Sequence, residues 1–185
     1  MGPEPSLREL RDRPFELLRE LERRGRAVAG GRDSAEGREW VGVAFRLGAE
    51  SFLVAREETR EVMALPSLLT RVPGARSWIR GLANVRGQLL PVIDLRQYLG
   101  SGVTPATRNV RVLIVNHRDI PAGLMVDEVQ GFRRFAETEF APTPPPTLVR
   151  CVRYLAGSFR RAGEGWPVLS LKLLVESPSF MQAAS

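Results

Sequence analysis

The feature that most constrains the fold of this chain is a pattern that occurs twice: a glycine, then ten residues later a Pro-Val pair that leads into a short amphipathic segment. The first copy has Gly81 before Pro91-Val92-Ile93-Asp94-Leu95, and the second has Gly157 before Pro167-Val168-Leu169-Ser170-Leu171. The long helical crossovers that a parallel α/β sheet needs between its strands are missing. The repeat therefore predicts a mainly β fold, built as two small and related β-barrel subdomains.

The first copy lies in the segment 72–100, which reads as a hairpin followed by a short helix. Apolar strands are predicted at 79–85 and 88–93, and Arg86-Gly87 supplies the turn because glycine reaches positive φ. Asp94 is a plausible N-cap for a helix that ends near Leu99. An arginine at the tip of a rigid hairpin could hold a partner's carboxylate, although by residue type alone it is more simply a solvated turn residue.

The remaining pattern is also one of short strands. Alternating apolar residues predict a strand that begins near Trp40 and a returning strand at 51–55. The segment 57–62 reads as a short helical turn, on which Glu61 would only cap or decorate a helix. Further strands are predicted at 110–115, 120–126 and 129–135, and a last pair within 149–169. A short C-terminal helix begins at Leu171, and Pro178 should end it.

The first thirty-nine residues follow a helical pattern of apolar residues and not a strand pattern. Apolar residues recur at helical spacing among charges, and the pattern predicts an N-terminal helix from Pro14 to near Arg26, followed by a glycine-rich linker. The predicted organisation is therefore an extension at 1–39, one domain at 40–177 and a tail at 178–185. The two subdomains of that domain are expected at approximately 40–100 and 108–177.

Composition excludes several classes of protein. A single cysteine, Cys151, excludes an intramolecular disulfide, and a single histidine, His117, leaves no Cys/His zinc cluster. No apolar run is long enough to span a membrane, and the charged N-terminus lacks the core of a signal peptide. We therefore expect a protein of the reducing cytoplasm that is not inserted in the membrane and holds no metal.

Residues for catalysis are scarce. His117 lies in a polar turn, Cys151 lies in an apolar pattern, and Ser77 and Ser158 have no base nearby in the sequence. Phosphate-binding glycine motifs are absent. We therefore predict that the protein is not an enzyme and uses no cofactor. A hydrolase using serine or cysteine would require a buried base beside one of these residues in space.

The net charge of +6 allows a different function. A small β-barrel with arginines gathered on one face could bind DNA or RNA, and this is the alternative function for the chain. The dense arginine groups, such as Arg133-Arg134 and Arg160-Arg161, are spread along the sequence, and Lys172 is the only lysine. Solvated faces and loop tips explain such groups better, so nucleic acid is not the expected partner.

Several motifs together resemble the CheW-like domain, the coupling module of bacterial chemosensory arrays. The motifs cover roughly residues 41–175 in family order and at family spacing. They are Phe45-Arg46-Leu47-Gly48, Glu61-Val62, Val72-Pro73-Gly74-Ala75, Gly81, Asn84-Val85-Arg86-Gly87, Leu90-Pro91-Val92-Ile93-Asp94-Leu95, Leu99-Gly100 and Gly123-Leu124-Met125-Val126-Asp127-Glu128-Val129. A narrower resemblance is to the branch of type IV pilus twitching-motility systems. It rests on the helix Pro14-Phe15-Glu16-Leu17-Leu18 and on the segment Trp78-Ile79-Arg80-Gly81-Leu82-Ala83-Asn84-Val85-Arg86-Gly87. Ser170 departs from the pattern, because the family often has Asp there.

The resemblance implies a fold and a function. The fold is two five-stranded SH3-like barrels, and the function is that of a non-enzymatic adaptor. It would couple the signalling tip of a methyl-accepting chemoreceptor to the regulatory domain of a CheA-type histidine kinase, in the cytoplasm at membrane-associated receptor arrays. The resemblance places receptor binding at Glu61, Gly81, Asn84, Arg86 and Gly87. It does not place the kinase contact.

Overall fold

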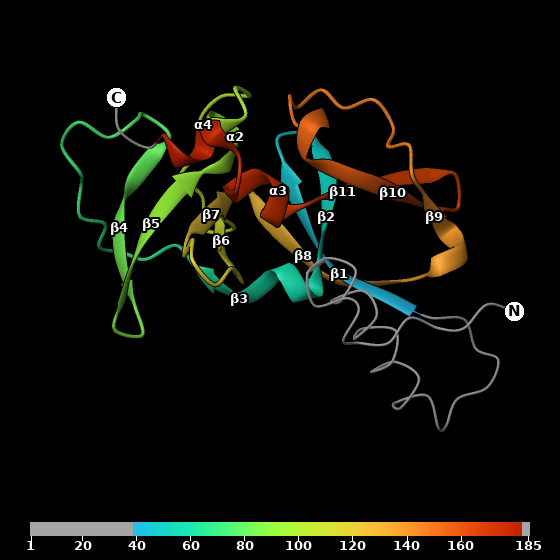
Figure 1. Cartoon of the computed structure of the whole chain (residues 1–185), viewed down its shortest axis with the longest axis horizontal. Helices are drawn as coiled ribbons and strands as arrows, with labels where there is room; N and C mark the ends of the chain where they lie inside the picture. Colours follow the sequence, from blue (N-terminus) through green and yellow to red (C-terminus); the bar gives the residue numbers. More distant parts are fainter. Residues whose placement is uncertain (1–38, 183–185) are drawn as a thin grey trace, which may run out of the picture. The chain divides into compact units, whose positions relative to one another are not determined.

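The computed structural model describes residues 39–182 of the chain. The helix predicted from Pro14 to near Arg26 and the linker after it lie outside the described residues. Within the described part, β-strands dominate and form two separate sheets (Figure 1). The mainly β prediction is therefore confirmed.

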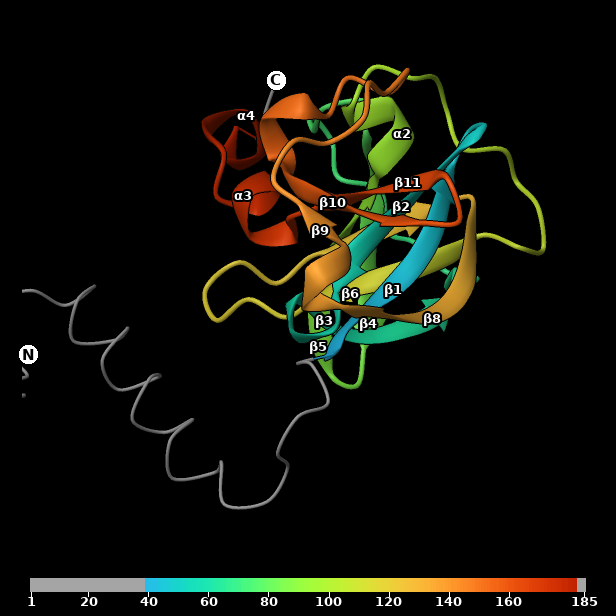
Figure 2. The same cartoon turned by 90° about the vertical axis from the view of Figure 1, so that its right-hand side faces the viewer.

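The first sheet, called sheet A here, has six strands in the order β8-β1-β2-β11-β10-β9. Its strands are β1 (Glu39–Leu47), β2 (Glu50–Ala55), β8 (Glu128–Ala136), β9 (Phe140–Ala141), β10 (Leu155–Arg161) and β11 (Glu164–Leu169). The pairs are antiparallel except for β2 and β11, which run parallel. Figure 2 looks onto this sheet, with the strands of the other sheet behind it.

The second sheet, sheet B, has five strands in the order β3-β6-β7-β5-β4. Its strands are β3 (Thr59–Ala64), β4 (Ile79–Val85), β5 (Gln88–Asp94), β6 (Arg111–Val115) and β7 (Gly123–Val126). Here β5 and β7 form the parallel pair. The short helices are α2 (Leu95–Tyr98), α3 (Leu171–Val175), α4 (Pro178–Met181) and the 3₁₀ turns η1 (Arg56–Glu58), η2 (Glu137–Glu139) and η3 (Val152–Tyr154).

The repeated sequence pattern builds the same local structure twice. Gly81 in β4 and Gly157 in β10 have φ of 146° and 144°, and the strand register shifts at each of them. Each hairpin then leads into a short helix whose N-cap side chain, Asp94 or Ser170, accepts a hydrogen bond from the third backbone N–H of the helix. The echo in the sequence thus reflects a structural repeat.

The predicted pair of closed five-stranded barrels needs a correction. Sheet A has six strands, and in neither sheet do the two edge strands pair through their backbones. Each sheet is instead curled, and side chains bridge its interior: the rings of Phe135 in β8 and Phe159 in β10 stack with centroids 4.8 Å apart. The sheets also interleave in sequence, because sheet B uses 59–126 and sheet A uses the segments on both sides. The division at 40–100 and 108–177 therefore does not follow the sheets.

Two local predictions were also wrong. The segment 57–62 is not one helical turn, because η1 ends at Glu58 and β3 already includes Glu61 and Val62. The C-terminal helix α3 ends at Val175, before the proline, and Pro178 opens the next helix, α4, as its first residue. Proline is well accommodated at that position because a first-turn N–H has no partner within the helix.

The largest apolar core lies between the two sheets. Strand β1 contributes to two cores, because successive side chains point to opposite faces. Phe45 packs in this central core and Ala44 packs inside the curl of sheet A. The central core takes residues from both sheets and from α2, α3 and α4, and it includes Phe45, Phe52, Ile93, Leu95, Leu113, Leu124, Leu169, Leu171, Leu174 and Phe180. A shared core of this size makes the two sheets one folding unit.

Candidate functional site

The turn of the β4–β5 hairpin is held by local bonds. Arg86 and Gly87 have φ of 52° and 85°, the left-handed values that a two-residue type I′ turn needs. The side-chain oxygen Oδ1 of Asn84 accepts a hydrogen bond from the Gly87 backbone N–H at 2.9 Å. Because Arg86 is not a glycine, its left-handed backbone is unfavourable alone, and the strands and the Asn84 bond hold it in place.

Arg86 reaches across the sheet to Glu61. Its Nη2 lies 2.6 Å from Oε2 of Glu61, which comes from β3, the strand at the opposite edge of sheet B. A second bridge lies beside it, where Arg60 Nη1 donates to Gln88 Oε1 at 3.2 Å. Side chains therefore connect the two edges of the curled sheet where backbone pairing does not.

This ion pair is open to water on the arginine side. The Arg86 side chain is 78% exposed and the Glu61 side chain 24%. An exposed pair of this kind contributes about 0–1 kcal/mol, since water competes with it and salt screens it. Breaking the Arg86–Glu61 pair to bind charged groups of a partner protein therefore costs little free energy. The pair also presents a cation and an anion close together on the surface.

Gly81 lies apart from this tip. It is buried at the other end of β4, where a Cβ atom would come within 2.7 Å of the Thr70 carbonyl oxygen. Thr70 and Leu82 exchange two backbone hydrogen bonds, at 2.9 and 2.8 Å, directly beside it. The structure thus brings Glu61, Asn84, Arg86 and Gly87 together, whereas Gly81 admits a close approach of the loop before β4.

Sheet A carries a similar pair at its own hairpin, which the sequence did not reveal. Arg161 binds both carboxylate oxygens of Glu139, with Nε–Oε1 at 2.8 Å and Nη2–Oε2 at 2.6 Å, and it lies over the Phe135 ring at 4.4 Å. The hydrogen bonds from Arg161 and from the Ala136 backbone N–H hold the pKa of Glu139 below its ordinary value. The guanidinium of Arg161 is thus held by two hydrogen bonds and a cation–π contact, whereas that of Arg86 has a single ion-pair contact.

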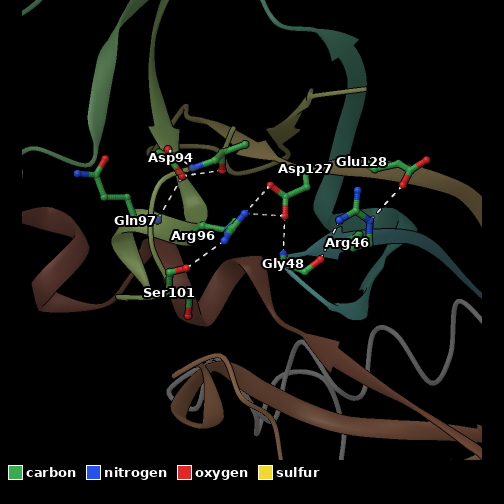
Figure 3. A network of polar contacts seen from close by, with 9 residues as sticks. Arg46, Gly48, Asp94, Arg96, Gln97, Ser101, Asp127 and Glu128 are labelled. Carbon is green, nitrogen blue, oxygen red and sulfur yellow. Dashed lines mark hydrogen bonds and ion pairs between the residues drawn. The ribbon is translucent and has the colours of Figure 1, made fainter. Parts of the chain in front are cut away.

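A second polar cluster joins the two sheets (Figure 3). Asp127, buried between β7 and β8, receives the Arg96 guanidinium at 3.2 Å and the backbone N–H of Gly48 in the β1–β2 turn. Arg46 continues the cluster with bonds to Glu128 at 3.2 Å and to the Gly48 carbonyl at 2.8 Å. Some of the motif residues that carry the family resemblance therefore have a structural role, which is to fix one sheet against the other.

Three of the four residues considered for catalysis are buried or bonded elsewhere, and the fourth, Ser77, is exposed. His117 Nε2 lies 3.0 Å from Glu176, and its Nδ1 accepts two backbone N–H bonds, which assigns the proton of a neutral ring to Nε2. The Cys151 thiol is buried, and this burial raises its pKa. Ser158 is buried and donates to the Thr143 carbonyl oxygen. Across residues 39–182, neither Ser158 nor Cys151 has a recorded bond to the histidine, and no group of three possible metal ligands occurs.

The arginine groups expected on solvated faces are largely paired. Arg134 binds Glu39 at 3.1 Å, and Arg133 lies over the Trp166 ring at 5.8 Å. Arg161 is occupied as described above. The carboxylates neutralise Arg134 and Arg161, which a nucleic-acid surface would otherwise use, whereas Arg133 keeps its charge. None of the helices in the described part is long and apolar enough to cross a membrane.

Comparison with known proteins gives a consistent result. The family model described as the CheW-like domain matches residues 41–179. The Protein PilI of Pseudomonas aeruginosa is 36% identical over 173 residues, covering 92% of this chain and 96% of PilI. The Chemotaxis protein CheW of Helicobacter pylori is 30% identical over 126 residues, covering 67% of this chain and 74% of its own.

A solved structure agrees with these sequence matches. The crystal structure of the scaffolding protein TtCheW from Thermoanaerobacter tengcongensis superposes with a TM-score of 0.68 at 26% identity. The superposition covers 80% of this chain and all of that one. The two-sheet architecture of this chain therefore has a known counterpart.

Proposed function

Because the chain belongs to the CheW-like domain family, whose members are non-enzymatic scaffolds, we propose that it couples chemoreceptors to a CheA-type histidine kinase in the chemosensory system of type IV pili. The observation that carries the pilus assignment is the likeness to PilI along nearly the whole length of both chains. The proposed location is the cytoplasmic face of the membrane, at receptor arrays.

The proposed receptor contact is the β4–β5 hairpin tip with Glu61 beside it. Arg86 would donate charge-assisted hydrogen bonds to a carboxylate of the receptor tip, and Glu61 would accept them from a cation. Asn84 and Gly87 keep the turn in the conformation that presents Arg86. Gly81 would act on the contact indirectly, through the position of the preceding loop.

Coupling requires that a change at one interface alters the free energy of the other. The adaptor makes no covalent bond in this process. A change in the receptor's conformation must therefore reach the kinase through the position of the adaptor's own two interfaces. The shared core and the Asp127 cluster support this role, because they hold the two sheets as one body. The kinase regulatory domain would bind a part of this body that the receptor leaves accessible.

The deciding experiment measures binding of the intact chain to the cognate kinase regulatory domain and to a receptor signalling-tip peptide, by isothermal titration calorimetry. We expect both to bind. Arg86→Glu should weaken receptor binding about tenfold or more, since it replaces an attraction by a repulsion at an exposed contact, and it should leave kinase binding unchanged. Arg118→Glu, an exposed arginine in another loop, is the matched control. If the intact chain binds neither partner, the proposed function is wrong.

A charge swap separates contact from internal support. The double variant Glu61→Arg/Arg86→Glu restores an ion pair between the same two positions but reverses both charges towards the receptor. If the residues act by direct contact, receptor binding stays low in the double variant. Recovery to the wild-type affinity would show instead that the pair only braces the sheet.

A further inference from the structure

The loop between β3 and β4 is fixed at several points. Thr70 is bonded to Leu82, and Ala75 closes a turn by donating to the Val72 carbonyl oxygen at 3.3 Å. Further on, Asp94 donates its backbone N–H to the Trp78 carbonyl oxygen at 2.8 Å. The Trp78 ring also packs against Phe180, with the ring centroids 5.9 Å apart. This loop therefore presents its side chains from a fixed backbone.

Two arginines of this loop and one at the start of β4 surround one open pocket. Arg71, Arg76 and Arg80 line a hollow of about 280 Å³ together with Ser77, and all three are exposed. Within residues 39–182, none of the three side chains forms an ion pair, a side-chain hydrogen bond or a cation–π contact. By contrast, Arg86 in the β4–β5 turn and Arg96 in α2 have carboxylate partners. Three like charges that share a pocket favour an anion brought in from outside.

An apolar hollow adjoins this pocket. It also measures about 280 Å³, and its walls include Val72, Leu82 and Pro91. Ala75 and Ile79, like Val72, line both hollows, so a basic and an apolar surface lie side by side. Leu82 and Pro91 are cross-strand partners in β4 and β5, and Val72 is 41% exposed. A partner that fits both hollows needs carboxylates next to apolar side chains.

We propose that the surface formed by Arg71, Arg76, Arg80, Val72, Leu82 and Pro91 is a docking site for an acidic amphipathic segment of a partner protein. The carboxylates of the segment bind the three arginines, and its apolar side chains enter the hollow beside Val72 and Pro91. A helix with an apolar stripe flanked by glutamates has this arrangement. Nucleic acid fits less well, because base stacking needs an open aromatic ring, and Trp78 is packed against Phe180.

This inference goes beyond the proposed function. It uses none of the side chains at the hairpin tip, and it needs neither a receptor nor a kinase. Gly81 connects this docking surface with the hairpin tip only through the backbone. The close approach of Thr70 to Gly81 fixes the position of the loop that carries Arg71 and Arg76.

The test uses the full chain and a fluorescein-labelled peptide of about 18 residues, with leucines at helical spacing and glutamates at the flanking positions. Binding is measured by fluorescence anisotropy at about 50 mM salt and again at about 300 mM. We expect binding that weakens with salt. The double variant Arg76→Glu/Arg80→Glu should reduce the affinity about tenfold or more, since both attractions become repulsions. Val72→Ser should also weaken binding, and that loss should persist at high salt.

Two controls make the result specific. Arg108→Glu/Arg118→Glu changes the net charge by the same amount at exposed arginines outside the pocket, and it should change the affinity by less than about twofold. Arg86→Glu should also leave the peptide affinity unchanged, so failure of this site is distinguishable from failure of the receptor contact. The proposal is overturned if the wild-type chain does not bind the peptide or if both double variants lose it equally. It is equally overturned if inorganic phosphate or a single-stranded DNA oligonucleotide, added at constant ionic strength, displaces the peptide completely.

Discussion

Gly81 and Gly87 lie in the same hairpin and both have positive φ, yet their surroundings differ. A Cβ atom on Gly87 would meet nothing within 4 Å, whereas one on Gly81 would come within 2.7 Å of a backbone oxygen. Gly87 is therefore needed only for the turn conformation. Gly81 is needed for the conformation and for the close approach of Thr70.

Alanine substitution should separate these two requirements. Gly163 in the β10–β11 turn has φ of 83° and open surroundings, so Gly163→Ala is a matched control for conformational strain alone. We expect Gly163→Ala to lower the free energy of unfolding by about 1 kcal/mol and Gly81→Ala by about 3 kcal/mol. Urea unfolding followed by circular dichroism measures both. Equal losses would mean that the Thr70 backbone moves away at no cost.

The residue types of the candidate site were predictable, but their contacts were not. The Asn-Val-Arg-Gly motif predicts a tight turn because glycine and asparagine favour positive φ and local side-chain bonds. The pairing of Arg86 with Glu61 depends on the curl of sheet B, which brings opposite edges together. No local pattern encodes that curl. Arg161 and Glu139 were missed for the same reason.

At the scale of elements, the start of α3 shows how the chain replaces a capping carboxylate. Asp94 caps α2 with its own side chain, whereas α3 has Ser170 at the equivalent position. There the carboxylate comes from Glu58 in η1, which accepts bonds from the Ser170 hydroxyl at 2.9 Å and from the Leu171 backbone N–H at 2.6 Å. The departure from the family pattern at Ser170 is therefore compensated by another element.

This exchange predicts that restoring the family residue is harmful here. Ser170→Asp would place a second carboxylate beside Glu58, and repulsion between the two should cost about 1–2 kcal/mol of unfolding free energy near neutral pH. Adding Glu58→Gln should recover most of that loss, because the amide no longer repels Asp. Thermal or urea unfolding of the three variants measures the effect. A Ser170→Asp variant as stable as the wild type would contradict this account.

Element prediction succeeded where turns and caps are encoded locally. The β4–β5 hairpin and the Asp94 cap follow from glycine, proline and aspartate at defined positions. The segment 57–62 misled because Glu57 and Glu58 favour a helical turn, while Glu61 and Val62 gain more from pairing with β6. Tertiary pairing outweighs local propensity in such a short segment.

At the scale of the whole molecule, the two sheets depend on each other through the central core and the Asp127 cluster. Asp127 is only 3% exposed and serves both Arg96 and the Gly48 backbone. Removing its charge takes away the carboxylate that pairs with Arg96, whose side chain is 21% exposed. The cluster therefore stabilises the relative placement of the sheets, on which the proposed coupling depends.

We expect Asp127→Asn to lower the free energy of unfolding by about 2 kcal/mol, because an incompletely buried arginine loses its counterion. Glu39→Gln, which removes an exposed pair with Arg134, is the control and should cost less than about 0.5 kcal/mol. Urea unfolding should remain a single transition, with tryptophan fluorescence and circular dichroism coinciding, since both sheets share one core. Two separate transitions would show that the sheets fold independently.

The global topology was the least predictable part. The repeat indicates two similar units, but a pattern of strands does not say which strands pair. Each half of the domain was expected to form its own barrel. Instead, β8 from the second half pairs with β1 from the first, and β11 from the second half pairs with β2 from the first. Such pairings are long-range, and hydrophobic periodicity carries no information about them.

The interleaved order of the strands also sets a schedule for biosynthesis. A ribosome delivers the chain from the N-terminus, and domains form as their residues emerge. All five strands of sheet B have emerged by Val126, whereas β2 must wait for β11, which ends at Leu169. The β1–β2 hairpin is thus synthesised before all of its partner strands. Strand β1 waits for β8 and strand β2 waits for β11, so both outer edges of the hairpin stay unpaired until late in translation.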